Sequence, residues 1–261
     1  MHNFEFVKPS TVAEAVRALG REDAQALAGG HTLLPTMKQR LAAPAVLVSL
    51  TGIPDLRGVR REGDALVIGA ATTHAEVAKA AAKDYPALAR LAGGIGDPAV
   101  RNRGTIGGSL ANNDPAACWP AGALGSGATI VTDRRQIAAD DFFRGLFTTA
   151  LEPAEIITAV RLPIPARAGY AKFEQPASRF ALTGAFVAQF PGGVRVAITG
   201  AGEDGVFRWA EAERALAANF AASALDGLGV SPDGLVGDLH GTPQYRANLV
   251  RVMTGRAVGA A

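Results

Sequence analysis

The stretch that decides the fold reads AGGHTLLPTMKQRL and spans residues 28–41. It follows a short apolar segment, AQALA at 24–28, and it precedes a continuous apolar run, AVLVSL at 45–50. The first segment predicts a strand, the quoted stretch an amphipathic helix, and the continuous run a buried parallel strand. Gly29 and Gly30 fall at the strand-to-helix turn of this small β-α-β unit.

Two interpretations of these glycines are open at this point. They can serve a tight turn and nothing more. They can also let the backbone approach an anion, because successive amides before a helix attract negative charge. Thr32 would add a hydroxyl donor. The stretch is neither a Walker motif nor a dinucleotide-binding G-x-G-x-x-G, so the turn alone does not choose between the two.

A second glycine-rich stretch, GTIGGSLANNDP at 104–115, strengthens the case for a ligand. We expect it to be a loop, because it is apolar only at Ile106 and Leu110 and is otherwise rich in glycine, hydroxyl and amide groups. Such a loop can wrap a polyphosphate and neighbouring hydroxyls without positive charge. A structural Ω-loop is the alternative. Two such stretches together favour a ligand with a pyrophosphate and several hydroxyls.

Two helix-capping signals occur elsewhere in the first half of the sequence. Thr11 with Glu14 predicts a capping box for a helix that ends at Gly20, and Thr73 with Glu76 predicts a second one. His74 follows as an early helical residue, and we interpret it, like His240, as an ordinary surface or cap histidine. After Pro165 the sequence predicts three strands, with a hairpin at PGG, and then two helices, as expected of an α+β lobe.

The composition excludes several classes of function. Of 261 residues 48% are hydrophobic, and 26 basic and 24 acidic residues leave a net charge of +2. The basic residues are scattered, so we expect no nucleic-acid partner. One cysteine, Cys118, and four separated histidines give no metal-ligand spacing, so we expect no metal site. The sequence has no apolar run of about 18 residues, so we expect no membrane span, and MHNFEFVKPS lacks a signal-like apolar region, which favours a cytoplasmic protein.

AGGHTLLPTMKQRL and TIGGSLANNDP together resemble the paired flavin-binding motifs of the medium, FAD-binding subunit of molybdenum hydroxylases. This family includes xanthine dehydrogenases, aldehyde oxidoreductases and aerobic carbon monoxide dehydrogenase. The resemblance extends over nearly the whole chain, through NFEFVKPSTVAEAVRAL, AADDFFRGLFTTALEPAEIITAVRLP and GDLHGTPQYRANLVRVMTGRAV.

The resemblance implies an α+β, three-lobed FAD-binding fold of the PCMH (vanillyl-alcohol oxidase-like) type. A first FAD-binding lobe would span 1–57 as a β-α-β unit, and a second would span 58–165. A lobe at 166–261, with a three-stranded antiparallel sheet plus helices, would resemble the C-terminal domain of the carbon monoxide dehydrogenase flavoprotein.

The resemblance also implies an oxidoreductase subunit that passes electrons through FAD to an external acceptor. Its partners would be a small 2Fe–2S subunit and a large molybdopterin subunit in a heterotrimer, and a dimer of heterotrimers is compatible with it. We name no catalytic residue. Two alternatives stay open: an independent flavin oxidoreductase, and a non-redox nucleotide-binding or assembly protein of the same fold.

By motif match the resemblance implies a set of cofactor-binding residues. They are Ala28, Gly29, Gly30, His31, Thr32, Leu33, Thr105, Gly107, Gly108, Ser109, Asn112, Asp114, Cys118, Ile157 and Lys172. Two departures from the family pattern concern the flavin ring: Cys118 stands where relatives often have Asp, and Arg179 stands where they usually have Asp. The segment before AADDFF is also shorter than in the family. His31 invites a covalent-flavin interpretation, but we take it to shape the turn.

Overall fold

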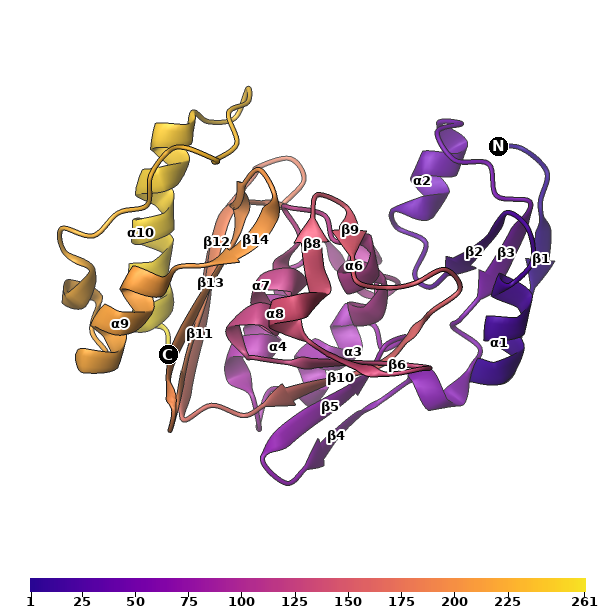
Figure 1. Cartoon of the computed structure of the whole chain (residues 1–261), viewed down its shortest axis with the longest axis horizontal. Helices are drawn as coiled ribbons and strands as arrows, with labels where there is room; N and C mark the ends of the chain where they lie inside the picture. Colours follow the sequence, from indigo (N-terminus) through magenta and orange to yellow (C-terminus); the bar gives the residue numbers. More distant parts are fainter.

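The computed structural model describes residues 1–261 and is built around three sheets that follow one another along its long axis (Figure 1). The N-terminal unit contains β1 (Glu5–Val7), α1 (Val12–Leu19), β2 (Ala24–Leu27), α2 (Leu33–Lys38), β3 (Val46–Ser49) and the 3-10 helix η1 (Pro54–Leu56). Its sheet has the order β1-β3-β2 and is parallel, which confirms the β-α-β unit.

The first helix begins where the sequence predicts, with one difference. The Thr11 hydroxyl accepts from the Glu14 amide, as expected of an N-cap, and Gly20 ends the helix. The Glu14 carboxylate, however, accepts from the amide and hydroxyl of Ser10 rather than from the Thr11 amide. The amphipathic helix expected in 28–41 is shorter than the quoted stretch: Met37 is buried in α2, whereas Leu41 lies beyond the helix and is 76% exposed.

The middle unit has a five-stranded antiparallel sheet of order β4-β5-β10-β6-β7 and a separate β8–β9 hairpin. Its strands are β4 (Val59–Glu62), β5 (Ala65–Gly69), β6 (Thr129–Thr132), β7 (Gln136–Ala138), β8 (Phe143–Gly145), β9 (Thr148–Thr149) and β10 (Ile157–Pro163). Its helices are α3 (His74–Ala80), α4 (Pro86–Gly93), α5 (Pro98–Arg101), α6 (Ile106–Asn112), α7 (Cys118–Gly125) and α8 (Ala139–Phe142).

The second glycine-rich stretch is a helix, which corrects the expectation of a loop. Thr105 caps α6 by accepting from the Gly108 amide, and Ile106 and Leu110 are fully buried on one face. A Cβ on Gly107 would lie 2.6 Å from the Cβ of Ala70, so the glycine lets α6 pack directly on the end of β5. Tertiary packing thus overrides the low helix propensity of glycine here.

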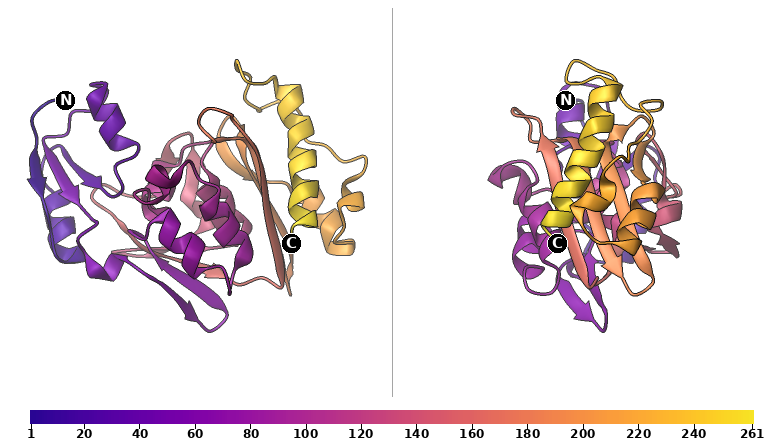
Figure 2. Two further views of the ribbon diagram at one scale, coloured as in Figure 1. Left: turned by 180° about the vertical axis from the view of Figure 1, so that it is seen from behind. Right: turned by 90° about the vertical axis from the view of Figure 1, so that its left-hand side faces the viewer.

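The C-terminal unit has a four-stranded antiparallel sheet, β11 (Arg167–Glu174), β12 (Ala181–Phe190), β13 (Gly193–Gly202) and β14 (Gly205–Arg208), with α9 (Ala210–Ala218), η2 (Ala222–Leu225) and α10 (Pro243–Gly259). The prediction of three strands was therefore one short. In Figures 1 and 2, α9 and α10 lie on the outer face of this sheet and the helices of the middle unit on the inner face. Both faces are thus covered, and Ala197 and Thr199 are fully buried although they alternate with Val196 and Ile198.

The chain has three apolar cores, and their positions correspond to the arrangement of the sheets and helices. The N-terminal unit has its own small core around Val48 and Ile53. The largest core joins α4 and α7 to the inner face of the C-terminal sheet, where Phe186 packs, and the third lies between that sheet and α10. The lobe boundaries 1–57, 58–165 and 166–261 stay a prediction. None of the helices combines the length and the apolar character that a membrane crossing requires.

Candidate functional site

One cavity of about 570 Å³ collects residues from all three units. Every residue that the sequence placed in the cofactor site lines it, from Ala28 in the first glycine-rich turn to Lys172 on β11. Their individual contacts with a ligand stay a prediction. The cavity is also lined by residues outside that predicted set. They are Gln25, Ala26, Leu27, Thr36, Leu50, Leu56, Ala70, Ala71, His74, Ile95, Gly96, Val100, Gly104, Ala111, Ala116, Ala117, Phe147, Leu151, Glu155, Ile156, Ser178, Arg179 and Phe180.

The turn between β2 and α2 presents unused backbone donors to this cavity. The amides from Gly29 to Leu33 donate to no backbone carbonyl of the chain. Gly30 has a φ of +77°, a conformation that glycine adopts without strain, and it redirects the backbone at this point. Consecutive free amides in such a turn form a concave site for an anion. We call the turn 29–33 the amide cradle.

Gly29 is also constrained by packing against the second glycine-rich stretch. A Cβ there would lie 2.2 Å from the carbonyl oxygen of Arg103 and 2.8 Å from the Cα of Gly104. The missing side chain therefore allows close contact between the amide cradle and the chain that leads into α6. It brings the two glycine-rich stretches together.

Within the second stretch, the helix α6 offers side chains rather than amides. The amide of Ile106 donates to Thr72, that of Gly107 to Ala70, and that of Gly108 to the Thr105 hydroxyl. Gly108 nevertheless lies opposite the residue that precedes the cradle, because a Cβ on it would lie 3.6 Å from the Cβ of Ala28 and 3.0 Å from the Thr105 hydroxyl. Polar contacts from α6 to a ligand must therefore come from side chains. Ser109 and Asn112 can supply them, because both lie on the cavity wall, one turn apart.

Lys172 and Cys118 meet away from the cradle. The Lys172 ammonium is 5% exposed and donates to the carbonyls of Gly94, at 2.7 Å, and Arg179, at 2.6 Å. Burial raises the pKa of the Cys118 thiol, although the Lys172 charge opposes this shift. Cys118 is therefore a neutral thiol at physiological pH. Arg179 has a φ of +61°, which is strained for a residue with a side chain, and it also lines the cavity.

Replacing Cys118 by Asp tests whether this departure matters to the bound flavin. A carboxylate beside Lys172 would gain a buried cation as partner. We expect Cys118→Asp to change FAD affinity or the flavin redox potential while circular dichroism shows an intact fold. Cys118→Ser, which adds no charge, is the control and should behave as the wild type. If neither quantity changes in Cys118→Asp, the thiol is a packing residue.

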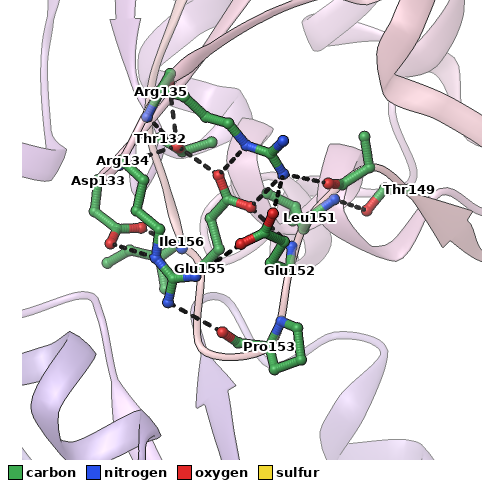
Figure 3. A network of polar contacts seen from close by, with 11 residues as sticks. Thr132, Asp133, Arg134, Arg135, Thr149, Leu151, Glu152, Pro153, Glu155 and Ile156 are labelled. Carbon is green, nitrogen blue, oxygen red and sulfur yellow. Dashed lines mark hydrogen bonds and ion pairs between the residues drawn. The ribbon is translucent and has the colours of Figure 1, made fainter.

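A buried carboxylate, that of Glu155, stabilises the cavity wall next to Ile156 (Figure 3). The side chain of Glu155 is inaccessible to solvent; its two oxygens accept from Arg135 at 2.9 Å, and the Thr132 hydroxyl and the Glu152 amide also donate to it. The Arg135 hydrogen bonds lower its pKa to about 2 from an ordinary 4.5. The network therefore stabilises the fold fully above pH 4.5 and loses this contribution as the pH falls towards 2.

His74 was wrongly interpreted as a surface residue. Its capping box is present, but its side chain is only 5% exposed and lines the cavity. Its Nδ1 accepts from the indole Nε1 of Trp119 at 3.0 Å. Burial lowers the pKa of His74 to about 4, with smaller contributions from His31 and Arg101. His240, in contrast, is exposed as predicted.

Comparisons with known proteins show what the whole chain is similar to. A family model described as "FAD binding domain in molybdopterin dehydrogenase" matches residues 2–165. The chain is 35% identical to the carbon monoxide dehydrogenase medium chain of Hydrogenophaga pseudoflava, covering 99% of this chain and 96% of the relative. It is 34% identical to the nicotine 6-hydroxylase medium subunit of Paenarthrobacter nicotinovorans, covering 97% and 95%. The structure of carbon monoxide dehydrogenase from H. pseudoflava superimposes with a TM-score of 0.89 at 36% identity, over 100% of this chain and 97% of that one.

Proposed function

Because this chain belongs to the family of FAD-binding subunits of molybdenum hydroxylases, we propose that it receives electrons from a partner chain on FAD and passes them to an external acceptor. The partners would be a small 2Fe–2S subunit and a large molybdopterin subunit. FAD, when bound, supplies the ability to exchange one or two electrons. The protein contributes binding, orientation and electrostatics.

The amide cradle is the observation that carries this proposal. Five consecutive amides without a backbone partner, opposite the cavity face of α6, suit the pyrophosphate of FAD. Gly108 leaves the space open between α6 and Ala28, and the Ser109 and Asn112 side chains offer neutral hydrogen bonds. The Glu155 carboxylate in the wall is neutralised by Arg135, so it does not repel the phosphates. These features fit the cofactor.

The residues of the chain also explain why partners are needed. A 2Fe–2S cluster is typically held by about four thiolates, whereas this chain has one cysteine, which is buried. Electrons from iron–sulfur centres must then arrive from another chain. The relatives are medium subunits of a carbon monoxide dehydrogenase and of a nicotine hydroxylase, two enzymes with different substrates. We therefore infer that a partner chain, rather than this subunit, determines the substrate of the assembly.

We expect the purified chain to bind FAD without oxidising carbon monoxide, aldehydes or aromatic heterocycles. Under anaerobic conditions, adding the two partner chains should produce substrate-dependent bleaching of the flavin absorbance, and the chain with only one partner is the control. Rapid bleaching in the isolated chain would show an independent flavin oxidoreductase. A preparation that stays colourless after incubation with FAD would favour a non-redox nucleotide-binding or assembly protein.

A further inference from the structure

Trp119, which is distant in sequence, fixes which nitrogen of the His74 ring carries the proton. An indole N–H can only donate, so the contact from Trp119 requires His74 Nδ1 to be unprotonated. The neutral ring then carries its proton on Nε2. The low pKa, about 4, keeps this neutral form throughout the physiological range. His74 is therefore a fixed donor at Nε2.

This donor is placed on the cavity wall. Trp119 occupies Nδ1, and Nε2 has no acceptor within the chain, although the ring is almost wholly buried and lines the cavity. The ring lies against Gly104, where a Cβ would come within 2.6 Å of Nε2. Glycine at 104 thus leaves room for the edge of the ring that carries the donor.

The donor also lies next to the amide cradle. Gly104 contacts the ring of His74 on one side and the backbone of Gly29 on the other, since a Cβ on Gly29 would lie 2.8 Å from the Gly104 Cα. His74 Nε2, Gly104 and Gly29 therefore form one contiguous wall. The phosphates that the cradle amides would hold are the anionic acceptors that the proposed cofactor would bring to this wall.

We propose that His74 donates its Nε2–H to a phosphoryl oxygen of FAD, as a binding residue that supplements the amide cradle. This inference rests on the proposed function and adds a specific contact to it. The hydrogen bond pairs a neutral donor with an anion, so it strengthens phosphate binding without adding a positive charge to the site. Trp119 acts as a positioning residue, because it selects the tautomer that can donate.

Two substitutions separate the donor from the rest of the ring. In His74→Asn the side-chain amide takes the position of Nδ1 and does not reach the cavity. In His74→Gln the longer side chain places its amide at the position of Nε2 and so retains a donor there. The lost hydrogen bond is one to a charged group, so we expect His74→Asn to weaken FAD binding by about tenfold or more. His74→Gln should stay within about threefold of the wild type. ADP, which has a pyrophosphate but no flavin, should lose affinity in parallel as a competitor.

Fluorescence titration of the full-length apoprotein measures these affinities, and ³¹P NMR of bound FAD should shift in His74→Asn and return in His74→Gln. His240→Asn, at an exposed histidine, is the matched control. Circular dichroism checks the fold. Should His74→Asn not fold, ¹⁵N-histidine labelling of the wild type gives the answer: FAD must shift the Nε2 signal of His74, assigned by its absence from the spectrum of His74→Gln.

The outcomes separate this inference from the proposed function. Unchanged FAD affinity in a folded His74→Asn variant, or no shift of the Nε2 signal, overturns the contact while leaving the FAD function in place. A loss of FAD affinity without a loss of ADP affinity moves the contact away from the pyrophosphate and overturns the phosphoryl assignment. Failure of the wild type to take up FAD overturns the proposed function and the contact with it.

Discussion

Gly108→Asp should abolish stable flavin binding while the apoprotein stays folded. The new carboxylate would project from α6 towards Ala28, into the space between α6 and the amide cradle. There it adds both bulk and a charge of the same sign as the pyrophosphate. Two like charges about 4 Å apart repel by about 4 kcal/mol at an effective dielectric constant near 20. FAD affinity should therefore fall by at least about a hundredfold.

Matched variants separate charge from bulk at this position. Gly108→Asn has nearly the same volume without the charge, so it should retain more affinity than Gly108→Asp. Gly192→Asp adds the same charge at an open hairpin outside the cavity and should bind FAD as the wild type does. Flavin content after gel filtration and circular dichroism of the apoprotein measure the two effects. Full flavin occupancy in Gly108→Asp would show that α6 is not part of the binding site.

Local patterns in the sequence were sufficient for the elements whose signals are local. A short apolar segment, an amphipathic stretch and a continuous apolar run predicted β2, α2 and β3, and the hairpin at PGG predicted the pairing of β12 with β13. The family resemblance then indicated which glycine-rich stretches share a site, and the structure brings them into one cavity. Their contacts with FAD are still untested.

The remainder depends on contacts that are distant in sequence. The helix α6 contains two glycines that lower its helix propensity, and it forms because Ile106 and Leu110 have a core to enter. The capping box at Thr73 was predicted, but the burial of His74 depends on Trp119, which lies 45 residues away. Glu155 likewise meets Arg135 across 20 residues of chain. No periodicity within one segment carries such information.

Gly29→Ala tests the reason for the first glycine, and we expect it to affect folding and binding together. The Cβ would lie 2.2 Å from the Arg103 carbonyl oxygen and 2.7 Å from its carbon, and both are backbone atoms that cannot rotate away. The amide cradle and the chain entering α6 must therefore move apart. Overpacking of this kind costs about 1–3 kcal/mol, so the free energy of unfolding of the apoprotein should fall by about 2 kcal/mol.

The same displacement would move the cradle amides away from Ser109 and His74, because Gly104 links the two walls. A ligand that contacts both walls would then lose part of one set of hydrogen bonds, and FAD should bind at least about tenfold more weakly. Gly20→Ala is the control in the same unit, since its Cβ would stay 3.5 Å from the nearest atom. Urea unfolding and FAD titration should separate the two glycines clearly. If Gly29→Ala matches the wild type in both measurements, close packing of the two stretches is not what requires glycine at this turn.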